Sequence, residues 1–270
     1  MVLPLRDLNP TKRLPVVTLT LIAVNVFVYF AVQPHGNAQK SDRFVYEHAV
    51  IPCEVVHGHP LTQKQVALDS CSVNHRDVTV TTDRGLVRLV DAPIAPHKNV
   101  YLAIIVSMFL HANLLHLLGN MLFLWVFGNN VEDHLRPIGF TIFYFAAGIV
   151  ATLAFITVNA SSVSPLVGAS GAIAGVMGAY LIWFPRVRVL SVVFPFIFFP
   201  FYLPAAALLI VWFVLQFFTD PNNGVAWVAH VAGFAFGAAV AFALRDTHGP
   251  VSRHVPPPPP LPGPWPGGLR

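Results

Sequence analysis

Five stretches of this chain contain no Asp, Glu, Lys or Arg, and they restrict its fold more than any other feature: 14–39, 99–131, 137–185, 189–219 and 221–244. A bilayer core is about 30 Å thick and requires about 20 helical residues, so each stretch is long enough to cross it. The third is too long for one crossing. It contains the turn-forming run Asn159-Ala-Ser-Ser-Val-Ser-Pro165, which divides it into a helix near 138–158 and another that begins around Ser170. The pattern predicts an all-α membrane protein with six transmembrane helices.

The composition supports a membrane protein. Hydrophobic residues make up 55% of the chain and charged residues only 10%, which is too apolar for a soluble protein of this length. The formal charge of +4 does not indicate nucleic-acid binding, because the basic residues are scattered or lie beside apolar segments, as topology signals do. We therefore expect the lipid bilayer, and no nucleic acid, as a partner.

The connections that carry cations predict the topology. Short cytoplasmic loops are enriched in Lys and Arg, and here these residues precede the first helix, separate the second from the third, and follow the fourth and the sixth; they are Arg6, Lys12, Arg13, Arg136, Arg186, Arg188 and Arg245. Both termini are therefore predicted to be cytoplasmic. The N-terminal segment would be 1–13, the helical domain 14–245, and the Pro-rich tail 246–270 a disordered cytoplasmic segment.

A large extracytoplasmic loop insert is predicted at 34–98, between the first two helices. Alternating residues at 78–80 and 86–89 predict a β-hairpin. Because this loop would face the oxidising side, we expect a disulfide between Cys53 and Cys71 rather than free thiols. A metal site is disfavoured, since the nearby histidines have no recognised ligand spacing.

The polar residues inside the predicted helices narrow the possible chemistry. The chain contains no His-Glu-x-x-His zinc motif, and none of the predicted spans contains the carboxylates that an aspartyl mechanism requires. A serine mechanism remains, with Ser170 as nucleophile and His230 as base. A helix from Ser170 to about residue 184 covers roughly 22 Å of a roughly 30 Å core, so its start lies below the outer surface. His230 lies about 8 Å from the outer end of a helix over 225–244, at a similar depth.

Small residues could allow these two helices to approach closely. Gly171 lies beside Ser170, and Gly233 and Gly237 follow His230 at i+3 and i+7, a spacing that permits backbone contact. The alternative is that the glycines serve packing alone, with Ser170 bonded to a backbone carbonyl and His230 a buried bystander. We favour the catalytic interpretation for the combination of residues.

The predicted second helix adds further hydrogen-bond donors. His116 and Asn120 are four residues apart and share a helical face. Together with the Ser170 amide they could stabilise an oxyanion, although intramembrane Asn and His also join helices by hydrogen bonds. His111 is offset to another face and is expected to support the loop or the start of the helix.

These motifs together resemble the rhomboid family of intramembrane serine proteases: Gly168-Ala-Ser170-Gly171, Ala229-His230-Val-Ala-Gly233-Phe-Ala-Phe-Gly237 and His111-x4-His116-x3-Asn120. The similarity covers roughly residues 1–245. It implies a six-helix bundle, a Ser–His dyad without a third acid, and cleavage of transmembrane protein substrates near the outer bilayer surface. We expect no cofactor and no metal, and supporting roles for Gly168, Gly171, Gly233, Gly237 and His111. The N-terminus resembles that of prokaryotic rhomboids, so we expect a multi-pass protein of a prokaryotic plasma membrane.

Two features modify these expectations. Some rhomboids have a Tyr four residues after the serine, where this chain has Ala174, so another group must orient His230. The aromatic helix predicted at 203–218 is a candidate lateral gate for substrate. The main alternative function is that of a non-catalytic rhomboid-like protein that binds transmembrane clients. The sequence specifies neither the physiological substrate nor the oligomeric state.

Overall fold

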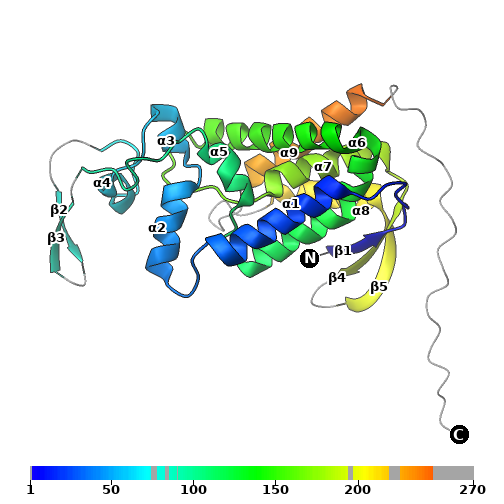
Figure 1. Ribbon diagram of the computed structural model, residues 1–270, viewed down its shortest axis with the longest axis horizontal. Coiled ribbons are helices and arrows are strands. Elements are labelled where there is room, and N and C mark those ends of the chain that lie inside the picture. Colours follow the sequence, from blue (N-terminus) through cyan, green and yellow to red (C-terminus); the bar gives the residue numbers. More distant parts are fainter. Residues whose placement is uncertain are drawn as a thin grey trace, which may run out of the picture.

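Helices form most of the part of the chain that the computed structural model describes, namely residues 2–73, 78–82, 85–89, 91–193, 197–218 and 226–245. The central bundle consists of α1 (Val16–Phe27) with a π-helical continuation (Val28–Val32), α6 (Leu114–Val158), α7 (Ser170–Trp183), α8 (Ala205–Gln216) and α9 (Trp227–Ala243). Figure 1 shows this bundle between a loop-rich insert at one end and a small sheet at the other. The predicted tail, 246–270, lies outside the described residues.

The long helix α6 consists of two arms. Arg136 has φ 67° and ψ 160° and is followed by Pro137, which lacks an N–H donor and disfavours helical geometry in the residue before it. The arms 114–135 and 137–158 thus lie where two helices were predicted. Within the described residues, α6 is the helix long and apolar enough to cross a bilayer; the apolar helices at Val16–Val32, Ser170–Trp183, Ala205–Gln216 and Trp227–Ala243 are shorter than 18 residues.

The described residues are mostly helical, as expected, but they also form a small sheet that was not predicted, in addition to the hairpin of the insert. β1 (Val2–Asp7), β4 (Arg188–Val193) and β5 (Ile197–Pro204) form an antiparallel sheet in the order β1-β4-β5. The described part of the uncharged stretch 189–219 thus contains most of β4, all of β5 and then α8 (Ala205–Gln216). Pro200 and Pro204 oppose a continuous helix there, and the neighbouring Val, Phe and Tyr residues suit strands.

Helix α7 is the centre of the bundle. All of its residues from Gly171 to Tyr180 are buried, and it packs most extensively against α9 and α6. A helix that is apolar on every side is expected to be surrounded by other helices. Its first residue, Ser170, is thus held by a rigid scaffold.

Buried acidic residues attach the N-terminal region to this core. The Glu132 carboxylate on α6 accepts hydrogen bonds from the amides of Val17 (2.9 Å) and Thr18 (2.8 Å), and so caps the start of α1. Asp7, at the end of β1, accepts from Asn130 Nδ2 (2.5 Å) and from the Tyr180 hydroxyl (2.7 Å). The sheet is therefore joined to both α6 and α7.

Asp7 is expected to make stability depend on pH. Burial raises the pKa of Asp7 to about 6, and the Tyr180 hydrogen bond opposes part of this rise. The folded protein then binds this proton more tightly than the unfolded chain, so the contribution is complete below about pH 4 and is lost as the pH rises toward about 6. Relative to Asp7→Asn, the native protein should lose up to about 3 kcal/mol of unfolding free energy between these limits, at about 1.4 kcal/mol per pKa unit.

Unfolding free energies in detergent micelles across this pH range would test the expectation. Asp42→Asn, which changes an exposed carboxyl on α2, should leave the pH dependence of the native protein intact. Parallel curves for the native protein and Asp7→Asn would contradict the role given to burial.

The predicted insert contains α2 (Ala38–His48), α3 (Pro52–His57), α4 (Gln63–Ala67) and the hairpin of β2 (Val78–Thr82) and β3 (Gly85–Leu89). It is attached to the segment that precedes α7. Val50 pairs with Leu166 in an antiparallel bridge, in which the Leu166 N–H donates to the Val50 carbonyl (2.8 Å), and the Cys53 N–H donates to the Ser162 carbonyl (3.0 Å). The insert thus contacts the chain that leads into Ser170.

Candidate active site

Ser170 begins α7 immediately after a turn that requires glycine. Gly168 has φ +124°, a conformation that residues with a Cβ rarely adopt. A Cβ on Gly168 would also lie 2.9 Å from the His116 Nε2 atom. The Gly168 N–H donates to the Ser107 carbonyl (2.9 Å), which fixes the turn from outside. The backbone before Ser170 is therefore held on both sides.

His230 projects from the first turns of α9 toward Ser170. Its Nε2 atom lies 2.8 Å from the Ser170 Oγ atom, although sixty residues separate them in the chain. The two helices can approach this closely because Gly233 has no side chain: a Cβ at this position would overlap the carbonyl oxygen of Gly171. The structure thus brings together the serine, the histidine and the glycines that the sequence singled out.

Two residues of α8 contact His230: Trp212, from the aromatic helix predicted as a lateral gate, and Gln216, which was not predicted as a site residue. The Gln216 Oε1 atom lies 2.8 Å from the His230 Nδ1 atom, and the ring centroids of Trp212 and His230 are 5.8 Å apart. Both contacts to the imidazole come from α8, whereas residue 174, four residues after Ser170, is an alanine. A glutamine near the end of an otherwise apolar helix was the available signal, because an uncompensated amide is costly in a bilayer.

His116 and Asn120 lie on the same side of the Gly168 turn. A Cβ on Gly168 would lie 3.6 Å from the Asn120 Nδ2 atom and still closer to the His116 ring. Both side chains come from the first arm of α6. Asn113 caps the start of this arm, and its side chain accepts a hydrogen bond from the His116 N–H (2.9 Å). Their donors therefore border the backbone that leads into Ser170.

The expected orientation of His111 was wrong. Its ring lies 5.2 Å from that of His116, centroid to centroid, and its Nε2 atom is 2.9 Å from the Asn120 Nδ2 atom. His111 precedes α6 (Leu114–Val158), so its direction does not follow from a helical offset relative to His116. Gln33 holds its backbone with two hydrogen bonds, to the His111 carbonyl (3.0 Å) and from the His111 N–H (2.9 Å).

Cys53 and Cys71 form a disulfide in the structure. With His57 they are a cluster in which potential ligand atoms lie within 4.8 Å of one another. Sulfur binds metals as a thiolate, and a disulfide has none. We therefore interpret the cluster as a disulfide that links two parts of the insert covalently, and not as a metal site.

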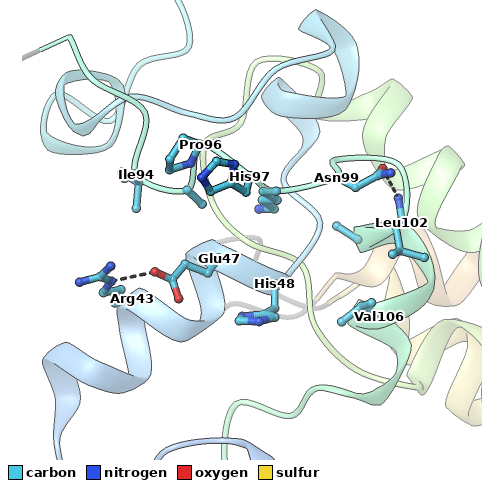
Figure 2. Close-up of a pocket in the computed structure, with 12 residues that line it drawn as sticks. Arg43, Glu47, His48, Ile94, Pro96, His97, Asn99, Leu102 and Val106 are labelled. Carbon is cyan, nitrogen blue, oxygen red and sulfur yellow. Dashed lines mark hydrogen bonds and ion pairs between the residues drawn. The ribbon is translucent and has the colours of Figure 1, made fainter.

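A cavity of about 570 Å³ lies outside the Ser170 region, between α2 and the segment 94–106. Figure 2 shows Arg43 and Glu47, joined by an ion pair (2.7 Å), on one wall and Leu102 and Val106 on another. Neither Ser170 nor His230 lines it. The paired charges and the different lining residues distinguish this cavity from the candidate active site.

Comparison with known proteins identifies the architecture. A family model described as "Rhomboid domain" matches residues 98–247, which is more than half of the chain. The chain belongs to the rhomboid family. It is also 32% identical over 148 residues to "Rhomboid protein 1, mitochondrial" of Saccharomyces cerevisiae. That match covers 53% of this chain and 35% of the yeast protein, so the chain spans about a third of the length of this relative.

Members of the rhomboid family are integral membrane proteins, and this chain is therefore one as well. The matched rhomboid domain contains Ser170, His230, His116, Asn120 and Gln216. Most of the insert, including the disulfide, precedes the match.

Proposed function

We propose that this rhomboid protein is an intramembrane serine endopeptidase that cleaves transmembrane segments of other membrane proteins with a Ser170–His230 dyad. The main support for this proposal is the 2.8 Å contact between Ser170 Oγ and His230 Nε2, a distance suited to proton transfer. Six spans would surround the dyad: α1 with its π-helical continuation, the two arms of α6, and α7, α8 and α9. Both termini would be cytoplasmic in a prokaryotic plasma membrane.

In the proposed reaction, His230 accepts the Ser170 proton at Nε2 while Oγ attacks the substrate carbonyl carbon. The imidazolium then donates that proton to the leaving amine, and water hydrolyses the acyl-enzyme with His230 again as base. A helical peptide bond is hydrogen-bonded and shielded, so the substrate helix must unwind locally. The small residues beside Ser170 favour small side chains at the scissile position.

The oxyanion would receive hydrogen bonds from the Ser170 amide, His116 and Asn120. An amide NH₂ group has two donor hydrogens. The Asn120 group is 2.9 Å from His111 Nε2, which uses one hydrogen and orients the amide. The second hydrogen remains to meet the negative charge that develops on the carbonyl oxygen. His111 would thus support catalysis through Asn120.

Cleavage of a labelled single-span substrate by purified protein in liposomes tests the proposal. The native chain should cleave the substrate, and His230→Ala should lose this activity while retaining the helical content of the native protein. If the native chain cleaves none of several substrates but captures them stoichiometrically, client binding without catalysis becomes the function and the protease proposal fails.

Replacement of Asn120 by alanine should lower kcat by about 10²- to 10³-fold, the usual effect of removing one oxyanion donor, with a smaller change in KM. Initial rates in liposomes measure both constants. Asn25→Ala is a matched control, because Asn25 is a buried helical asparagine that donates to the Leu21 carbonyl (2.7 Å) within α1. An Asn120→Ala enzyme with native kcat would remove Asn120 from the oxyanion site.

A further inference from the structure

Gln216 is the last residue of α8, and its side-chain amide connects that helix to His230. The residue is only 8% exposed. Its Nε2 atom lies 3.1 Å from the Trp212 carbonyl oxygen, one helical turn earlier, and its Oε1 atom lies 2.8 Å from the His230 Nδ1 atom. Both ends of the amide therefore have hydrogen-bond partners.

The direction of these hydrogen bonds follows from the Trp212 carbonyl oxygen, which can act only as an acceptor. A carbonyl oxygen can only accept, so the Trp212 carbonyl requires the Gln216 NH₂ group on its side. The Gln216 oxygen then faces His230 and can only accept, so the proton of the neutral imidazole must be on Nδ1. The His230 Nε2 atom, 2.8 Å from Ser170 Oγ, is left with its lone pair toward the hydroxyl.

We propose that Gln216 is a positioning residue of the active site, which holds His230 in the tautomer and ring orientation that accept the Ser170 proton. This inference rests on the proposed protease function. It adds Gln216 to the Ser–His pair as a hydrogen-bond acceptor for His230 that does not itself take up a proton. When Nε2 takes the serine proton, both ring nitrogens carry hydrogen. The Gln216 carbonyl dipole then continues to accept from Nδ1 and stabilises the imidazolium.

A neutral amide suits this place better than the carboxylate of soluble triads. Burial of an ionised carboxylate costs several kcal/mol even when it is paired, and the cost within a bilayer is also high. The amide supplies an acceptor without a formal charge, and the Trp212 carbonyl supplies the orientation that a free amide would lack. Trp212 also packs beside the imidazole, with ring centroids 5.8 Å apart.

Steady-state kinetics in liposomes, with a labelled single-span substrate, test the kinetic part. Gln216→Leu keeps a similar volume but removes the acceptor, and kcat should fall about 10- to 100-fold, as for loss of a hydrogen bond to a charged group; KM should change less than twofold. Gln216→Glu keeps an oxygen that can accept from Nδ1 in either protonation state, and should recover most of kcat. Val214→Ala, at a 45% exposed position of α8, is the control.

The tautomer itself can be measured without activity. In full-length protein labelled with ¹⁵N-histidine, the His230 resonances, assigned by comparison with His230→Gln, should show hydrogen on Nδ1 in the native chain and a mixture of tautomers in Gln216→Leu. Hydrogen on Nε2 in the native chain, or an unchanged kcat in Gln216→Leu, would overturn the proposal. A native chain that cleaves nothing yet shows hydrogen on Nδ1 would refute the protease function but support the hydrogen bond from His230 to Gln216.

Discussion

Ser170→Ala is expected to reduce cleavage of a single-span substrate by at least about 10⁴-fold, the scale of losses when a hydrolase of this kind lacks its nucleophile. The methyl group of alanine cannot attack a carbonyl, and oxyanion donors alone leave only weak residual catalysis. Because Ser170 is the first residue of α7 and the change removes a single oxygen, the fold should persist. Product formation over several hours, measured by gel shift of the labelled substrate, gives sufficient range for this comparison.

Ser164→Ala is the matched control for this substitution. Ser164 is an exposed serine in the segment that precedes α7, so its loss should leave the cleavage rate within about twofold of native and test whether serine content near the site matters by itself. Cleavage by Ser170→Ala above about 1% of the native rate would show that another nucleophile operates.

Gly237→Ala should destabilise the bundle by about 3 kcal/mol or more, at or beyond the upper end of ordinary overpacking. A Cβ at this position would overlap the carbonyl oxygen of Gly175 and lie 2.8 Å from its Cα atom. Both are backbone atoms, so no side-chain rotation relieves the clash, and α9 must move away from α7. Because His230 lies on α9, cleavage should fall together with stability.

Unfolding free energy in mixed micelles, measured alongside cleavage, tests the Gly237 prediction. Gly119→Ala is the control, because a Cβ at Gly119 on α6 meets no atom within 4 Å and alanine is the better helix former by about 1 kcal/mol. Native stability in Gly237→Ala would mean that the α7 and α9 backbones are less closely packed than described.

The sequence predicted the parts of this site that rest on helical periodicity. Ser170 and Gly171 on one helix, and His230 and Gly233 on another, occur at spacings that bring small residues to one face, and the structure places these faces in contact. Arg136 and Pro137 likewise mark the break in α6. These features depend on the spacing of residues within one segment, and this spacing can be read directly from the sequence.

Features that depend on the ends of elements were not predictable in the same way. Gln216, the last residue of α8, contacts His230 of α9, and no sequence motif records how the end of one helix lies relative to another helix. His111 reaches Asn120 because it lies before α6, whereas periodicity describes only residues within a helix. The pairing of β1 with β4 joins residues far apart in the chain, so neither strand predicts the other.

Because the insert is attached to the segment before α7, residues outside the rhomboid match help to hold the chain that leads into Ser170. The rhomboid match begins at residue 98, yet the Leu166 amide donates to Val50 and the Ser107 hydroxyl accepts from the Val50 N–H (2.6 Å). A chain shortened to the matched residues would leave these groups without their partners beside the Gly168 turn. Joining residues 98–247 alone to another N-terminal half would therefore require that half to supply an equivalent of Val50.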